Sequence, residues 1–279
     1  MGAAELVPGF SGGTVALVAG LYARLVEQIR TGAVALVALL TLRPRAMLEA
    51  LRRLDPTFLV PLLVGMALAL LTLATGVEGL LAAEPIAMSS VFLGLVAGSA
   101  IVARRQFRSA RPHHALVVVA AAIGTFVALG ASPGVVAAPG PVTLAAAGAL
   151  AVSAWILPGV SGSFLLLVLG LYPVVIGAVA ARDLIVLLPF AIGMVAGLAA
   201  SATALDALLV RAHDVVLAAL VGLMVGSVRV LWPWPVGTGV GDPALGAPDG
   251  DVVLAGGLAL VSALAVVAFS RAARRLGGG

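Results

Sequence analysis

The sequence predicts an all-α, polytopic membrane protein, built as an inverted repeat with one re-entrant helical hairpin and three transmembrane helices in each half. Three observations support this fold class. The chain of 279 residues is 62% hydrophobic and 10% charged, with a mean hydropathy of +1.21, which is far more apolar than a soluble domain requires. Several runs reach the roughly 20 mostly apolar residues that a spanning helix needs. One interrupted apolar motif occurs twice.

Six uninterrupted apolar segments are expected to cross the bilayer. They are residues 57–75, 86–103, 114–130, 184–204, 215–231 and 252–270. The remaining apolar stretches, 1–22 and 142–180, carry the interrupted motif. Residues 32–54 begin with an apolar run too short to span and end in a basic amphipathic stretch. We therefore expect the segment 23–56 to lie at a membrane interface.

The two copies of the motif divide the chain into two halves. ELVPGFSGGTVALVAGLY occupies positions 5–22, and WILPGVSGSFLLLVLGLY occupies 155–172, with the Pro-Gly, Ser-Gly and closing Gly-Leu-Tyr positions in register. The similarity continues downstream. Pro61, Gly65 and Met66 align with Pro189, Gly193 and Met194, and Gly94, Leu95, Gly98 and Ser99 align with Gly222, Leu223, Gly226 and Ser227. The first repeat is assigned to 1–130 and the second to 131–279.

An odd number of spans in each half means that the second repeat must be inverted in the membrane. The arginines predict the same orientation, because cytoplasmic loops are enriched in basic residues. All 16 basic residues are arginine, and they concentrate in 23–56, in 104–113 and after 270, whereas the loops 76–85, 131–141 and 232–251 contain none. We expect a multi-pass protein of the cytoplasmic membrane with a cytoplasmic C-terminus, and we attribute the high isoelectric point to these loops rather than to nucleic-acid binding.

The first hairpin is shorter than the second at its start. About fifteen apolar residues, 142–157, precede the turn in the second motif, whereas seven residues precede Pro8. We expect one short helical arm to be missing from the start of the given sequence, so that the natural chain begins upstream of Met1.

Each motif has the composition of an anion site inside a membrane. Irregular backbone is tolerated at membrane depth where it is buried in protein or lines a cavity. Proline ends the first arm of each hairpin, glycines allow close backbone approach, and the second arm opens with free N–H groups and hydroxyls. Such a helix start suits phosphate or carboxylate. The candidate binding residues are Pro8, Gly9, Ser11, Gly12, Gly13 and Thr14, with Pro158, Gly159, Ser161, Gly162 and Ser163 in the second motif.

At this point the sequence resembles a known family. GAAELVPGFSGGTVALVAGLYARLV and ILPGVSGSFLLLVLGLYPVVI are similar to the paired signatures of the polyprenyl-phosphate transporter family. The resemblance implies translocation of undecaprenyl phosphate across the cytoplasmic membrane for reuse in cell-envelope synthesis. It also implies that the proline, glycine, serine and threonine positions of the two motifs form the substrate site. Alternating access around a site near the midplane is the mechanism expected of inverted repeats.

Two further residues are candidates for the site, and the sequence allows two other functions. Glu5, an intramembrane carboxylate, and Arg229, near the outer end of a span, are candidates for coupling or for shaping the site, with a proton or sodium as the coupling ion. A small-anion channel or secondary transporter is the alternative function. An intramembrane serine hydrolase is a weaker one, because GFSGG matches a nucleophile motif but the three histidines lie at span ends. With no cysteine and no ligand cluster, neither a metal nor another cofactor is expected. The sequence does not indicate the oligomeric state.

Overall fold

The structure is all-helical, as the sequence predicts. The computed structural model describes residues 1–2, 11–109, 111–130, 136, 138–158, 162–235 and 244–276. Within these ranges the regular structure is helical, apart from one isolated β-bridge between Pro235 and Leu245. The first half contains α2 (Gly12–Val18), α3 (Tyr22–Leu40), α4 (Pro44–Arg52), α5 (Pro56–Ala83), α6 (Pro85–Arg104) and α7 (Pro112–Leu129). The second half contains α8 (Pro141–Ile156), α9 (Gly162–Val168), α10 (Tyr172–Ala181), α11 (Leu184–Arg211), α12 (His213–Gly226), the 3-10 helix η1 (Ser227–Leu231) and α13 (Val252–Leu276).

Among the residues that the structure describes, six helices are long and apolar enough to cross a membrane, so this is a multi-pass membrane protein. The spanning segments are Pro56–Leu73, Pro85–Arg104, Pro112–Leu129, Leu184–Arg211, His213–Leu231 and Val252–Ala272. They confirm the six predicted spans, whose ends agree within two residues except that the fourth helix continues to Arg211 instead of ending at 204. The first spanning segment of each half belongs to a helix of 28 residues with an internal proline, Pro61 in α5 and Pro189 in α11.

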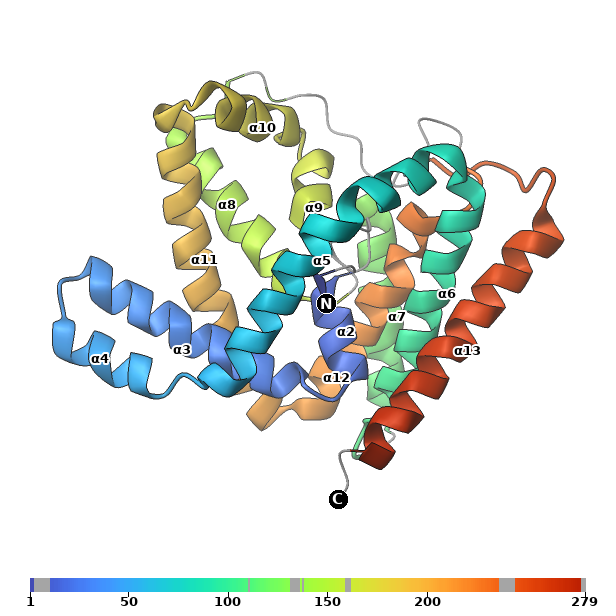
Figure 1. Ribbon diagram of the computed structural model, residues 1–279, viewed down its shortest axis with the longest axis horizontal. Helices are drawn as coiled ribbons and strands as arrows, with labels where there is room; N and C mark the ends of the chain where they lie inside the picture. Colours follow the sequence, from blue (N-terminus) through green and yellow to red (C-terminus); the bar gives the residue numbers. More distant parts are fainter. Residues whose placement is uncertain are drawn as a thin grey trace.

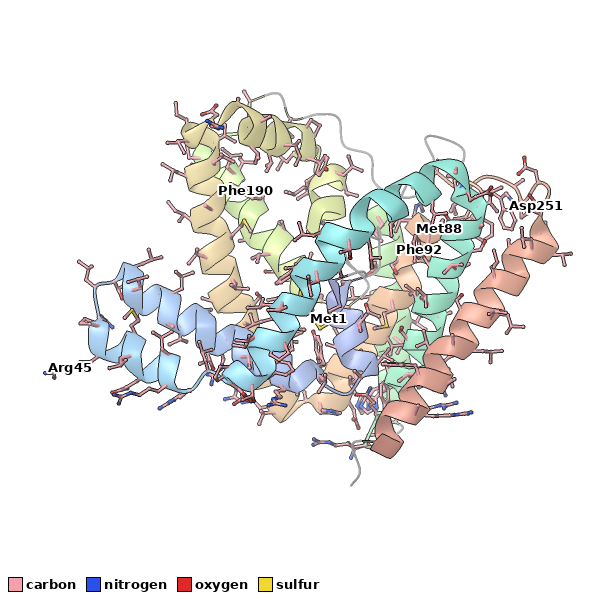
Figure 2. All side chains as sticks on the ribbon, in the orientation of Figure 1. Met1, Arg45, Met88, Phe92, Phe190 and Asp251 are labelled. Carbon is pink, nitrogen blue, oxygen red and sulfur yellow. The ribbon has the colours of Figure 1, made fainter. Side chains whose placement is uncertain are left out.

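Short connections set the directions of these helices. A single residue joins α5 to α6 and α11 to α12, so each pair runs antiparallel. In Figure 1, α5, α7 and α12 run toward the upper end of the molecule, whereas α6, α11 and α13 run toward the lower end. We call the lower end, with α4, the α6–α7 loop and the C-terminal end of α13, the arginine-rich end. Figure 2 shows Arg45 at this end and Asp251 near the other.

Glycines at aligned positions of the two halves permit the closest helix packing. A Cβ on Gly94 of α6 would lie 2.0 Å from the carbonyl oxygen of Ala259 in α13, and one on Gly98 would lie 2.7 Å from that of Ala263. In the other half, a Cβ on Gly222 or Gly226 of α12 would lie 2.6 Å or 2.7 Å from the carbonyl oxygen of Val118 or Ala122 in α7. These are the small-residue contacts by which membrane helices approach each other. Helix α6 therefore pairs with α13 as α12 pairs with α7.

The residues between the first motif and the first span form two helices. Helix α3 has 19 residues where its counterpart α10 has 10, and α4 follows it with arginines and exposed leucines. The sequence prediction of one interfacial segment missed the continuity of α3, because its apolar run alone is too short to span. The position of α4 at a membrane interface stays a prediction.

Helices from both halves meet in one buried core. It contains residues of the first hairpin, of α3 and α6, and of α11 and α12, among them Leu17, Val26, Val96, Ala202, Leu217 and Met224. Helix α2 is thus held between elements of both halves.

Candidate functional site

The first motif forms the start of helix α2, deep inside the protein. Ser11 precedes the helix in an extended conformation, and Gly12 and Gly13 form its first positions. The side chains of Ser11 and Thr14 are 2% and 0% exposed, and their hydroxyl oxygens lie 3.5 Å apart. The other predicted residues of this motif, Glu5, Pro8 and Gly9, lie outside the described residues.

The second motif lies between α8 and α9. Helix α8 ends at Ile156, and Pro158 in the following turn is buried. A Cβ on Gly162, the first residue of α9, would lie 2.4 Å from the carbonyl oxygen of Ala151, so glycine lets the two arms close together. Helix α8 has 16 residues and α9 has seven, each too short to span. Gly159 and Ser161 lie outside the described residues, as does the side chain of Ser163.

The two motifs touch where α2 begins and α8 ends, and we call these places the tips of the motifs. The Ser11 hydroxyl donates to the carbonyl oxygen of Leu157 at 3.3 Å, and the Tyr22 hydroxyl donates to that of Ile156 at 3.2 Å. A Cβ on Gly13 would lie 2.8 Å from the Ile156 oxygen. Figure 1 shows α2 leaving this contact toward the arginine-rich end and α9 leaving it toward the opposite end. The structure thus brings together two segments that the sequence separates by more than 130 residues.

The contact has the donors of an anion site, and it is closed. The hydroxyls of Ser11 and Thr14 lie beside the N–H groups at the start of α2, where the Thr14 N–H bonds to the Ser11 carbonyl at 2.9 Å. Helix α2 has only two turns, so these local N–H and O–H donors matter more than the helix dipole. In this structure the Ser11 hydroxyl donates to a protein carbonyl, and Ser11 is shielded from solvent.

Comparisons with known proteins agree with this architecture. A family model described as undecaprenyl phosphate translocase-like matches residues 1–244. The chain belongs to the undecaprenyl phosphate translocase-like family. A curated polyprenyl-phosphate transporter from Vibrio cholerae is 38% identical over 234 residues, which are 84% of this chain and 75% of the relative. No solved structure matches the chain. The family resemblance found in the sequence is thereby confirmed.

The closing Gly-Leu-Tyr of each motif has a local structural role in this member of the translocase-like family. Gly20 and Gly170 adopt φ of +75° and +70°, the left-handed conformation that favours glycine. At each position the glycine N–H and the following leucine N–H bond back to the short helix, as in a Schellman cap. The tyrosines that follow diverge: Tyr22 is buried against the second tip, whereas Tyr172 is 37% exposed.

Arg229 belongs to η1 and packs beside the C-terminal end of α7, at the end of the molecule opposite the arginine-rich end. Its guanidinium stacks on the ring of Phe126, 4.7 Å from the centroid, and fills the space beside Gly130. The nearby Trp232 and Trp234 donate their indole N–H groups to the carbonyls of Gly246 and Asp249. These two rings therefore bind the segment that precedes α13.

Several residues that support the translocase-like fold were not singled out in the sequence. Asp55 and Asp183, at aligned positions, accept N–H bonds at the starts of α5 and α11. Asp55 also accepts from Arg24 and from the Thr57 hydroxyl at 2.6 Å, and these bonds lower its pKa to about 2. Gln106 donates to the Leu17 carbonyl at 2.7 Å, at the end of α2. An Asp directly before each proline-containing span was the available signal for the caps, whereas nothing local points to Gln106.

Proposed function

We propose that this protein translocates a polyprenyl phosphate, specifically undecaprenyl phosphate, across the cytoplasmic membrane, holding the phosphate between the tips of its two hairpins. The observation that carries the proposal is the direct contact between Ser11 and the Leu157 carbonyl. It joins the start of α2 in the first motif to the end of α8 in the second motif at a single place. The name of the Vibrio cholerae relative supports the substrate class, and family membership supports a carrier rather than an enzyme.

The proposed phosphate site consists of Pro8, Gly9, Ser11, Gly12, Gly13 and Thr14 facing Pro158, Gly159, Ser161, Gly162 and Ser163. Backbone N–H groups and hydroxyls hydrogen-bond phosphate oxygens, and each bond to a charged group contributes about 1.5–3 kcal/mol. The glycines keep Cβ atoms out of the contact, so that the backbones approach the ligand. The phosphate takes over the donors that now bond to protein.

The proposed mechanism is alternating access between the repeats 1–130 and 131–279. An exchange of the halves by a two-fold axis turns the α6–α13 pair into the α12–α7 pair, and both pairs are present. The opposite directions of α5 and α11 in Figure 1 support inversion. Closed tips require that the hairpins part toward one side at a time, and rocking of inverted repeats provides such a motion.

The charge distribution supports the proposed orientation. The arginine-rich end contains the C-terminal end of α13 and would be cytoplasmic by the positive-inside rule. Arg229, near the opposite end, would meet the phosphate as it enters from outside. Glu5, three residues before Pro8, stays the candidate for coupling to a proton or sodium.

The proposal is tested by serine substitutions in the protein reconstituted into vesicles with fluorescent undecaprenyl phosphate. Ser11→Ala and Ser161→Ala each remove one phosphate donor, so transport should fall roughly ten- to a hundredfold, the equivalent of 1.5–3 kcal/mol. Ser201→Ala is the matched control, because its hydroxyl bonds within α11 to the Gly197 carbonyl. Equal transport rates in all variants would show that the phosphate does not bind at these tips. Flux of inorganic phosphate alone would indicate a small-anion carrier, and release of phosphate from the lipid would indicate a hydrolase.

A further inference from the structure

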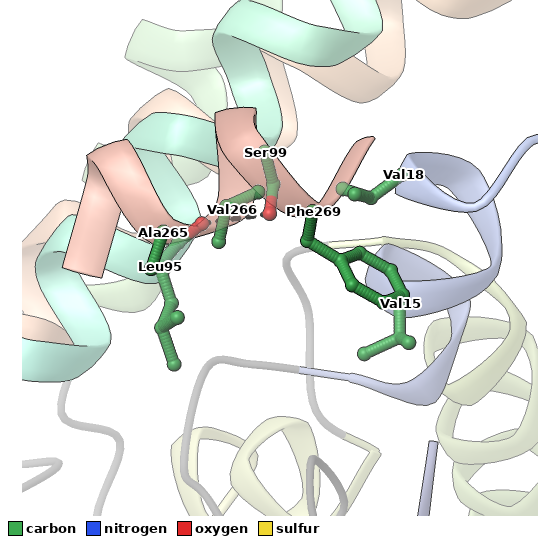
Figure 3. Close-up of a pocket in the computed structure, with 7 residues that line it drawn as sticks. All are labelled: Val15, Val18, Leu95, Ser99, Ala265, Val266 and Phe269. Carbon is green, nitrogen blue, oxygen red and sulfur yellow. Dashed lines mark hydrogen bonds between the residues drawn. The ribbon is translucent and has the colours of Figure 1, made fainter. Parts of the chain in front are cut away.

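An apolar groove runs beside the first hairpin, between α2, α6 and α13 (Figure 3). Its volume is about 290 Å³. It is lined by Val15 and Val18 of α2, Leu95 and Ser99 of α6, and Ala265 and Phe269 of α13. The groove lies toward the arginine-rich end, because Ser99 is close to the C-terminal end of α6 and Phe269 is two residues before Arg271.

The lining of the groove suits a hydrocarbon chain. The one polar side chain, Ser99, donates its hydroxyl to the Leu95 carbonyl at 2.7 Å, so its hydrogen-bonding need is met within α6. A water molecule in a groove of this composition would lack the two to four polar partners that hold ordered water. An apolar chain suits this lining instead, and because the groove opens to lipid rather than to water, it is held by close packing against the lining side chains.

The groove adjoins the start of α2. Val15 directly follows Thr14, and its N–H bonds to the Ser11 carbonyl at 3.4 Å, so the groove starts one helical turn from the tip. Its other side is open, since the Phe269 ring is 57% exposed on a helix that spans the membrane. A lipid whose phosphate lies at the tip can therefore lay the beginning of its chain along α2, with the remainder in the bilayer.

We propose that this groove binds the phosphate-proximal isoprene units of the polyprenyl chain, in the half of the membrane nearer the arginine-rich end. The inference rests on the proposed function and adds to it the place where the chain is recognised. Such a groove distinguishes a prenyl lipid from a free anion, because an anion has no use for an apolar opening beside its site.

The test places a large side chain at the edge of the groove so that it occupies the space of the lipid chain. Ala265 and Ala268 are both exposed on α13, but only Ala265 lines the groove. The experiment measures binding of undecaprenyl phosphate, and of isopentenyl phosphate as a chain too short to extend along α2, to the purified full-length protein. With Ala265→Trp we expect undecaprenyl phosphate to bind about tenfold more weakly, the equivalent of about 1.4 kcal/mol, with isopentenyl phosphate unchanged. Ala268→Trp, the matched control, should change neither.

The outcomes separate this inference from the proposed function. A wild-type protein that neither binds nor transports undecaprenyl phosphate refutes the function itself. Two results would refute the groove and leave the function standing in a wild type that transports. In one, both tryptophan variants bind undecaprenyl phosphate equally well. In the other, Ala265→Trp weakens the binding of both probes to the same extent. If that variant does not fold, a polyprenyl phosphate with a photoreactive group near its phosphate end provides the answer in the wild type. Labels on α2, α6 or α13 support the groove, whereas labels elsewhere, or labels displaced equally by ordinary phospholipid, overturn it.

Discussion

Gly13→Ala tests whether the contact between the two tips is part of the transport cycle. The added methyl group would lie 2.8 Å from the Ile156 carbonyl oxygen, where ordinary contact begins at 3.4 Å. The difference, 3.4 − 2.8, requires the tips to part by about 0.6 Å, and both partners are backbone or fixed to it. Overpacking of this kind costs about 1–3 kcal/mol, which reduces the population of the closed state roughly five- to 150-fold.

The assay compares transport by Gly13→Ala with transport by Gly32→Ala in reconstituted vesicles. A Cβ on Gly32 in α3 meets no atom within 4 Å, so this control makes the same chemical change in open space. Alanine favours a helix over glycine by about 1 kcal/mol in both positions, and the comparison cancels that term. If transport passes through the closed tips, only Gly13→Ala should lose activity, by about the factor above.

Thermal unfolding of both variants shows whether a loss of transport merely reflects a loss of stability. Two results would contradict the reasoning. One is a Gly13→Ala protein that transports as fast as Gly32→Ala, and the other is a protein whose loss of transport disappears at a temperature where it is fully folded.

The remaining predictions concern the supports of the fold. Gly94→Ala and Gly222→Ala place a Cβ 2.0 Å and 2.6 Å from atoms of α13 and α7, so each should lower the unfolding temperature through a cost of about 1–3 kcal/mol. Gly65→Ala, with nothing within 4 Å, should not lower it, and equal unfolding temperatures for all three would contradict the pairing. Asp55 has its pKa lowered from 3.8 to about 2, first by the Thr57 hydroxyl and then by Arg24. Its stabilisation is therefore complete above pH 3.8 and is lost as the pH falls toward 2, so the difference in unfolding temperature between wild type and Asp55→Asn should shrink across that range; a difference independent of pH would refute the assignment.

Features that depend on neighbouring residues were predictable. The six spans follow from the length of apolar runs, and the break between α8 and α9 follows from Pro-Gly and Ser-Gly placed within such a run. The glycines at positions 20 and 170 also depend only on local conformation, because a positive φ at the end of a short helix favours glycine whatever surrounds it. The aligned glycines of α6 and α12 could be found, although not the helices that they contact.

The contacts between distant segments were not predictable. In a membrane, lipid chains are as apolar as a protein core, so hydropathy does not show which face of a helix packs against protein. Leu95 and Phe269 have the same character as dozens of lipid-facing residues, and only the approach of α2, α6 and α13 makes them line a groove. For the same reason the sequence does not show whether Tyr22 lies at the membrane interface or bonds within the protein, as it does to Ile156.

The sequence by itself determined the membrane class, the spans, the paired motifs and the family, because each depends on composition, run length or the order of residues along the chain. Tertiary structure alone decided that the two tips meet, that Ser11 and Tyr22 bond across the halves, and that an apolar groove begins beside them. These depend on which helix faces come together, and that choice is made by close packing of small residues rather than by hydropathy.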